Sequence, residues 1–272
     1  MTSRVAVVIP LYKQSMTAPE EFSFKNTLSV LSQHDIYVIC PERLNGYLSV
    51  LKKEKRLNFD IEYFSNRFFS NIDGYNNLLM SVEFYRRFDC YDYILVAQID
   101  CIVFADQLKE WCEFNYSYIG APWLKGLTRP SFPLSFLGVG NGGFSLRKVS
   151  DCLIVLSSPE FRPPVNGKVT LRLSEIFLLT GFFKKTLRFS YKFPPIRLAI
   201  NEDIFWGVLV PGRYGLFNVP RPEDAISFAF EAAPEYLFEL NGYQLPFGCH
   251  AWERYNPQFW RDKLRKIGMD LP

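Results

Sequence analysis

Apolar runs alternate with helix-like segments through the first hundred positions of the chain. Val5–Pro10 is an apolar run closed by a proline, and Tyr93–Ala97 is a second one that leads into Gln98-Ile99-Asp100. In the helix-like segments apolar side chains recur every three to four positions. The expected strands are Val5–Pro10, Ile36–Cys40, Phe59–Phe64 and Tyr93–Ala97, and the expected helices are Phe22–Ser32, Leu44–Lys53 and Gly74–Phe88. Strands separated by helices of this length indicate βαβ units, so we predict an α/β fold with a mostly parallel central sheet flanked by helices.

In such sheets ligands bind beyond the carboxyl ends of the strands. The loops that follow Ile9, Ile39 and Ala97 should therefore lie on the functional edge of the molecule.

The second half of the chain has a different pattern. Tyr116–Trp123 and Phe136–Arg147 alternate short strands with glycine-rich turns, and helices are expected over Val149–Leu156, from Asn201 onward and over Asn256–Ile267. The segment 160–197 is proline-flanked, basic and aromatic, which is typical of an insertion or flap. We expect one domain over 1–272, which divides by its pattern into a first half (1–104) and a second half (105–272).

Composition excludes several classes of protein. The net charge is +3 at pH 7, which is too weakly basic to indicate nucleic-acid binding. No apolar run reaches about 18 residues, so no membrane-spanning helix is expected. The N-terminal residues lack the pattern of a signal peptide, and the six cysteines are scattered without a Cys-x-x-Cys pair. Reduced thiols and a cytoplasmic location fit these features.

Two clusters could bind a cation or a phosphate group. Asp100 follows a buried strand, where a carboxylate can hold a divalent cation or cap the next turn. His250, in Phe247–Trp252, could join Asp100 at a metal site, although a lone histidine is more often structural.

Two further clusters could serve catalysis or substrate binding. Gly138–Arg147 has four glycines in six residues, which allow a backbone to approach a ligand and to adopt positive φ, but a tight hairpin is the alternative. In Asn201-Glu202-Asp203 the asparagine suits a helix N-cap and the acids suit a first helical turn. The functional interpretation is that one of the two carboxylates is a general base.

Together and in this order, these clusters resemble a group of bacterial GT-A glycosyltransferases first catalogued as a domain of unknown function. They are more distantly similar to Fringe-like inverting transferases. The resemblance covers most of the chain and includes Val7–Lys13, Gly74–Leu79, Tyr93–Phe104, Tyr118–Trp123, Gly140–Lys148, Asn201–Trp206 and Gly248–Trp252. It implies transfer of a sugar from a nucleotide-sugar donor, a UDP-sugar, to a hydroxyl of a glycan or lipid-linked oligosaccharide, in bacterial lipopolysaccharide O-antigen or capsule synthesis.

The resemblance also implies a role for each matching position. Asp203 is the catalytic base with Glu202 beside it, and Asp100 and His250 hold Mn²⁺ or Mg²⁺. The expected donor-binding residues are Pro10, Leu11, Tyr12, Lys13, Tyr75, Gln98 and Asp100. The expected sugar- and acceptor-binding residues are Trp123, Asn141, Gly142, Gly143 and Arg147.

One departure bears on the metal. Gln98 stands at the first position of the Asp-x-Asp motif, where an amide oxygen is a weaker ligand than a carboxylate, so Arg147 or Lys13 could neutralise the diphosphate instead. The alternatives are an inactive nucleotide- or glycan-binding module and a nucleotidyltransferase. The loop after the first strand has no glycine, which disfavours the nucleotidyltransferase. The flap could cover the cleft or rest on the inner membrane face.

Overall fold

A six-stranded sheet runs through the centre of the computed structural model, which describes residues 3–127, 129–130, 132–159, 161, 168–170 and 197–269. The strand order is β3-β2-β1-β4-β9-β6. The first four are parallel, whereas β9 runs antiparallel to β4 and to β6. Their bounds are β1 Val5–Pro10, β2 Asp35–Pro41, β3 Asp60–Phe64, β4 Tyr93–Ala97, β6 Tyr118–Ile119 and β9 Phe144–Lys148. The predicted mostly parallel sheet is confirmed.

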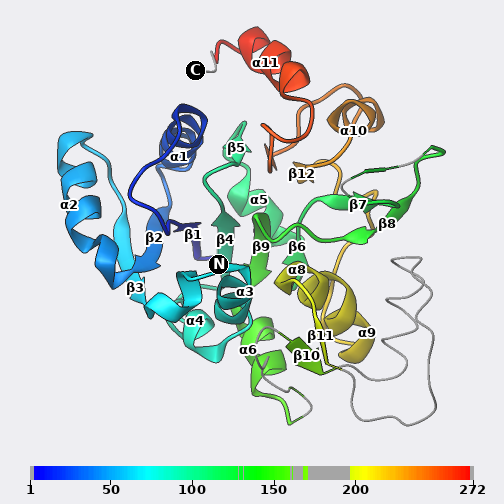
Figure 1. The fold of residues 1–272 in the computed structure, drawn as a ribbon. Coiled ribbons are helices and arrows are strands. Elements are labelled where there is room, and N and C mark those ends of the chain that lie inside the picture. The colour runs from blue at the N-terminus through cyan, green and yellow to red at the C-terminus, as the bar shows by residue number, and fades with distance from the viewer. Residues whose placement is uncertain are drawn as a thin grey trace.

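Helices cover both faces of this sheet (Figure 1). One face packs against α1 (Ala18–Val30), α2 (Asn45–Glu54) and α5 (Leu108–Glu113). The other packs against α3 (Ile72–Leu79), α4 (Val82–Arg86), α6 (Val149–Ser157) and the π-helical segment η3 (Phe205–Leu209). Sheets covered in this way need strands that are apolar on both sides, which explains the continuous apolar runs in the sequence.

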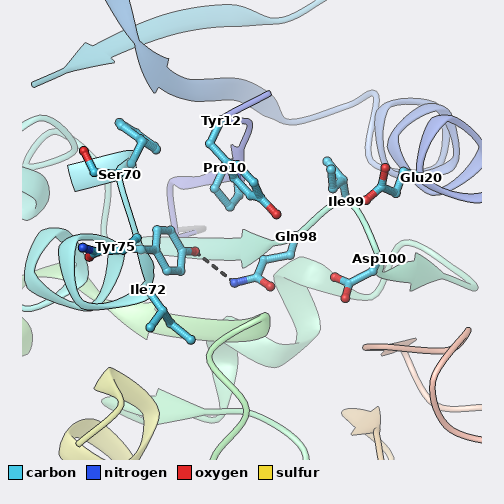
Figure 2. A pocket seen from close by; sticks show the side chains of 11 residues that line it. Pro10, Tyr12, Glu20, Ser70, Ile72, Tyr75, Gln98, Ile99 and Asp100 are labelled. Atoms are coloured by element: carbon cyan, nitrogen blue, oxygen red, sulfur yellow. Dashed lines mark hydrogen bonds between the residues drawn. The ribbon is translucent and has the colours of Figure 1, made fainter. Parts of the chain in front are cut away.

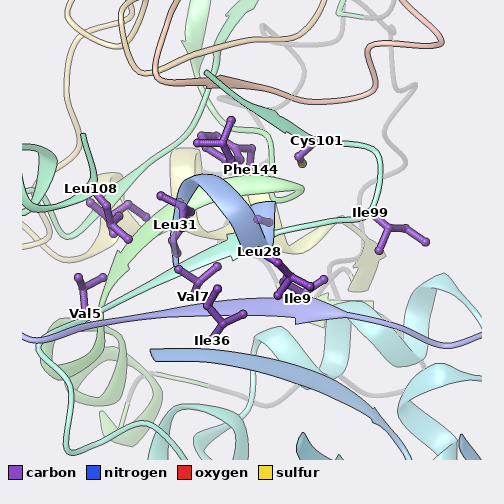
Figure 3. Close-up of a cluster of buried hydrophobic side chains, with 14 of the residues drawn as sticks. Val5, Val7, Ile9, Leu28, Leu31, Ile36, Ile99, Cys101, Leu108 and Phe144 are labelled. Carbon is purple, nitrogen blue, oxygen red and sulfur yellow. The ribbon is translucent and has the colours of Figure 1, made fainter. Parts of the chain in front are cut away.

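Strand β1 shows how the two layers are filled. Val5, Val7 and Ile9 point into the core under α1, where Leu28 and Leu31 meet them (Figure 3). Ala6 and Val8 point to the opposite face. The side-chain period of two thus places alternate residues of one strand in two separate cores.

Shorter strands and helices complete the fold around the central sheet. Strands β12 and β13 are parallel and β13 pairs antiparallel with β5, while β7 and β8 form a hairpin. The strand bounds are β5 Ile102–Val103, β7 Pro122–Leu124, β8 Phe136–Val139, β10 Lys168–Thr170, β11 Arg197–Ala199, β12 Ala229–Phe230 and β13 Gly248–Cys249. The remaining helices are η1 Glu42–Leu44, η2 Asn66–Phe69, α8 Glu202–Ile204, α9 Val210–Arg213, α10 Pro234–Leu240 and α11 Pro257–Lys266.

Two predicted helices differ from the observed ones for reasons of capping. Helix α1 begins at Ala18 rather than Phe22, because Thr17 and Glu20 form a reciprocal capping box. The single helix predicted over 74–88 is two helices, because the Ser81 hydroxyl accepts the backbone N–H of Phe84 and so starts α4.

The predicted flap over 160–197 lies outside the described residues except for Phe161 and its two short strands, β10 and β11, which pair antiparallel. Within the described part of the chain, no helix combines the length and the apolar character needed to cross a membrane. All six cysteines are free thiols.

Candidate functional site

Two adjoining cavities lie at the carboxyl end of the parallel strands. The first has a volume of about 420 Å³ and is bordered by the chain after β1, by the start of α3 and by Gln98–Asp100 after β4 (Figure 2). The loop after β2, which the sequence also placed at this edge, does not contribute to either wall.

The second cavity has a volume of about 320 Å³ and lies on the side of the β7–β8 hairpin and α8. It shares Ile72, Tyr75 and Gln98 with the first cavity, so the two lie on either side of these residues. Its wall includes Trp123, Asn141, Gly142, Asp203, Glu231 and His250. The arrangement could hold an elongated ligand whose two ends occupy different cavities.

Five side chains form a polar cluster where the cavities meet. Gln98 donates its amide N–H to the Tyr75 hydroxyl (3.2 Å), which leaves its Oε1 3.3 Å from Nε2 of His250. The same Nε2 lies 3.4 Å from Oδ1 of Asp100. On the other side of the ring, Nδ1 lies 3.1 Å from Oε1 of Glu231. Because the Gln98 amide is held by Tyr75, its oxygen faces the cluster rather than solvent (Figure 2).

The charges in this cluster stabilise one another. Burial opposes the charge on His250, but Asp100 and Glu231 outweigh it and raise the pKa of the imidazole to about 10. Burial also opposes ionisation of Asp100, yet His250 holds the pKa of this carboxyl below its ordinary value. At neutral pH the cluster is therefore an imidazolium between two carboxylates.

The neighbouring carboxylate at Glu202 has a structural partner. Its oxygens lie 3.0 and 2.9 Å from Nη2 of Arg147, whose side chain is fully buried. Arg147 also donates to Ser145 (3.0 Å) and to the Tyr85 hydroxyl (3.3 Å). The backbone N–H of Glu202 donates to Oδ1 of Asn76. This network fixes the start of α8 against α3 and the strand β9.

Asp203 also lies in the wall of the second cavity, together with Glu202 and Glu231. Burial is the largest cause that raises its pKa, followed by the charges of Glu202 and Glu231, and together they bring it to about 7. The N–H of Ile204 donates to its Oδ1 at 2.8 Å, which fixes the orientation of the carboxylate. A group with such a pKa, at the wall of a cavity, can exchange a proton near neutral pH.

The glycine-rich segment provides space for these side chains. A Cβ atom on Gly142 would overlap the Glu202 carboxylate, one on Gly143 would overlap the His250 ring, and one on Gly140 would overlap Trp123. Positive φ in this segment occurs at Asn141 (68°), not at these glycines. The glycines thus permit side chains of the chain itself to pack on the backbone, which corrects the expectation of positive φ.

The structure brings Asp100, Asp203 and His250 together around the adjoining cavities. Of the other residues predicted to bind substrates, Pro10, Tyr12 and Tyr75 line the first cavity, and Trp123 with Asn141–Gly143 lines the second.

Four placements differ from the expectation. Leu11 is fully buried in the core and Lys13 pairs with Glu20 at 2.6 Å, and neither belongs to a cavity wall. Arg147 lies behind the glycine-rich turn, so it does not reach a diphosphate or an acceptor. Asn201 makes no side-chain cap and instead accepts a hydrogen bond from Asn76.

Glu231 is the residue of the cluster that the sequence did not indicate. It follows the two-residue strand β12, and the register of β12 with β13 places it opposite His250. An acid after a buried strand was the signal that singled out Asp100, but β12 is too short to be recognised in the sequence.

Comparison with known families gives one match that covers most of the chain. A family described as "Protein of unknown function (DUF5672)" matches residues 58–250. The chain belongs to this family. Membership in a family of unknown function agrees with the resemblance seen in the motifs, while the relation to Fringe-like transferases stays a prediction. Curated proteins gave no match.

Solved structures share the fold. The chain is similar to mouse xyloside xylosyltransferase 1 in its apo form, with 12% identity, a TM-score of 0.52 and coverage of 91% of this chain and 97% of that one. It is also similar to the apo glycosyltransferase GlyE of Streptococcus pneumoniae, with 15% identity, a TM-score of 0.43 and coverage of 92% and 54%. At these identities the first likeness concerns the fold alone, and the second, with a TM-score below 0.5, carries no argument. This DUF5672 protein has a glycosyltransferase-like fold of the GT-A type, as predicted.

Proposed function

We propose that this DUF5672 protein transfers a sugar from a nucleotide-sugar donor to a hydroxyl of a glycan acceptor, with inversion at the anomeric carbon. The observation that carries the proposal is the pair of adjoining cavities. The Asp100–His250 pair stands where they meet, and Asp203 stands in the wall of the second. A donor lying across the shared wall would present its anomeric carbon to the cavity that holds a carboxylate.

The first cavity suits a nucleotide. Tyr12 is half exposed and lies in the wall of this cavity, where a nucleobase could stack on its ring. Pro10 and Ile99 offer apolar contacts. The donor diphosphate would then lie near Gln98 and Asp100. We assign a UDP-sugar as the donor, in keeping with the resemblance of the sequence.

The residues near the diphosphate fit a divalent cation. Oδ1 of Asp100 is buried and receives no hydrogen bond from the described residues, and Oε1 of Gln98 and Nε2 of His250 face the same space. The oxygen ligands suit Mn²⁺ or Mg²⁺, and the imidazole is a better ligand for the transition metal Mn²⁺ than for Mg²⁺. In the described chain no group of three His, Cys, Asp or Glu side chains is arranged to hold a metal ion, so the amide of Gln98 would have to serve as the third ligand. A bound cation would offset the negative charge of the leaving diphosphate.

Asp203 would act as the general base. Its carboxylate takes the proton of the acceptor hydroxyl while that oxygen bonds to the anomeric carbon and the bond to the diphosphate oxygen breaks on the opposite face. A carboxylate with a pKa of about 7 is both ionised and basic enough at neutral pH. Glu202, which is buried against Arg147, would position Asp203 rather than take the proton.

Asn141 offers a contact for the transferred sugar or the acceptor. Its side chain is almost fully buried in the wall of the second cavity, and its Nδ2 has no hydrogen-bond partner among the described residues. A buried donor without a partner is costly, and a sugar hydroxyl would satisfy it. Trp123 would provide an apolar surface for the acceptor. An acceptor in bacterial surface polysaccharide synthesis, including a lipid-linked one, is part of the proposal.

The proposal is tested by a thermal-shift screen of UDP-, GDP- and CMP-sugars with and without Mn²⁺. A ligand that binds the folded state must raise the melting temperature by mass action. Asp100→Asn should reduce the rise, whereas the exposed Glu113→Gln on α5 removes the same charge without affecting it. With the donor identified, NMR of the transferred sugar gives the anomeric configuration. No shift with any nucleotide-sugar would refute the proposal, and binding without turnover would make the protein a binding module.

A further inference from the structure

We propose that Glu231 is a positioning residue that holds His250 with Nε2 toward Asp100 and Gln98, and thereby completes a site for a divalent cation. This inference rests on the proposed function. It concerns a residue that the sequence did not point to and that belongs to a different strand from any of the ligands.

The backbone places Glu231 beside the histidine. Strands β12 and β13 are parallel with Phe230 opposite Cys249, so the next residues along each strand, Glu231 and His250, are neighbours. The N–H of His250 donates to the Phe230 carbonyl at 3.0 Å, which fixes the backbone on both sides of the pair. Both residues therefore follow directly on paired strands, which places their backbones side by side.

The two ring nitrogens of His250 face different groups. Nδ1 faces Oε1 of Glu231 at 3.1 Å, and Nε2 faces Gln98 Oε1 at 3.3 Å and Asp100 Oδ1 at 3.4 Å. A carboxylate on Nδ1 keeps the proton there, so that Nε2 has a lone pair when a cation replaces its proton. This is the arrangement in which a carboxylate orients a metal-bound histidine and raises its basicity.

Among the described residues, the side chain of Glu231 hydrogen-bonds to His250, and its charge also raises the pKa of Asp203. The side chain is 18% exposed and lines the second cavity. Gly143 lies against the ring near Nε2, where any side chain would overlap it. The Gly143 backbone and the hydrogen bond between Glu231 and the Nδ1 edge thus limit the movement of the ring from two sides.

The experiment measures Mn²⁺ binding by electron paramagnetic resonance, in the presence of UDP, for wild type, Glu231→Ala and Glu231→Gln. We expect the dissociation constant of Mn²⁺ to rise about 10- to 100-fold in Glu231→Ala. Glu231→Gln keeps an acceptor for the Nδ1–H, so its loss should be smaller. Glu239→Ala, on the exposed side of α10, removes the same charge and should bind Mn²⁺ as wild type does.

Thermal unfolding in EDTA separates positioning from a structural role. A structural role would lower the melting temperature of Glu231→Ala equally with and without Mn²⁺, whereas the proposal requires the rise caused by Mn²⁺ to shrink. The proposal is overturned if Glu231→Ala and wild type bind Mn²⁺ equally, or if wild type binds none. Sugar transfer that continues in EDTA would leave the proposed function intact while removing the cation site. Weakened Mn²⁺ binding in Glu231→Ala without consumption of any nucleotide-sugar by wild type would support the cation site and contradict the proposed function.

Discussion

Replacing Glu202 by glutamine should lower the free energy of unfolding, because this residue, although it stands beside the proposed base, has a structural role. The Glu202 carboxylate is 4% exposed and pairs with a fully buried Arg147 at 2.9 Å. Removing its charge leaves the guanidinium in the interior without a counter-ion. Burial already opposes that charge, and Glu202 is the main group that compensates it.

The size of the effect follows from this burial. Breaking a buried ion pair from one side costs about 3–5 kcal/mol, because the remaining charge is not compensated. The lower end applies here, since Ser145 and Tyr85 still accept hydrogen bonds from Arg147 and the new amide oxygen can do so as well. A loss of about 3 kcal/mol corresponds to a fall of roughly 6–12 °C in melting temperature.

Thermal and urea unfolding of the purified variant give both quantities. Glu83→Gln is the matched control, because Glu83 pairs with Arg67 at 3.8 Å on the surface, where such a pair contributes about 0–1 kcal/mol. If Glu202→Gln melted within about 2 °C of wild type with the same urea midpoint, the structural assignment of Glu202 would be wrong. Glu202 would then again be a candidate for the base.

Two further predictions concern the same wall of the site. The pKa of Asp203 in the folded state, about 7, is above the ordinary value of 3.8. The protonated carboxyl therefore stabilises the folded protein at low pH, and this contribution falls as the pH rises from about 4 and is fully lost above about 7. Asp203→Asn should therefore be more stable than wild type at pH 8 and nearly equal at pH 4, and urea titrations that differ by the same amount at both values would contradict this. Gly143→Ala should displace His250 and remove the Mn²⁺-dependent rise in melting temperature, whereas Gly212→Ala, with open space around it, should keep that rise. An unchanged rise in Gly143→Ala would show that the ring can move aside.

The sheet was predictable because its signals are local. Val5–Pro10 and Tyr93–Ala97 are apolar on both faces, and each is observed as a strand with those bounds. The break between α3 and α4 was missed because a serine capping interaction at Ser81 interrupts a segment whose helical spacing continues. Hydrophobic periodicity does not report such a cap.

The site was predictable only in part, because several roles depend on partners that are distant in the chain. Asp203 could be named as the base from its motif, but its difference from Glu202 arises from Arg147, 55 residues away. The glycines of 140–143 were read as space for a ligand, whereas they accommodate Trp123, Glu202 and His250. In each case the residue type could be read from the chain, whereas its role depended on a tertiary contact.

The central claim is that Asp203 faces a sugar-transfer site that Asp100 and His250 help to build. It is tested most directly by measuring donor affinity and the rate of nucleotide release on the same preparations of wild type and Asp203→Asn. The account predicts a dissociation constant for the nucleotide-sugar within about threefold of wild type, with a rate about 10²–10⁴-fold lower. Release of the nucleotide at the wild-type rate by Asp203→Asn would contradict it.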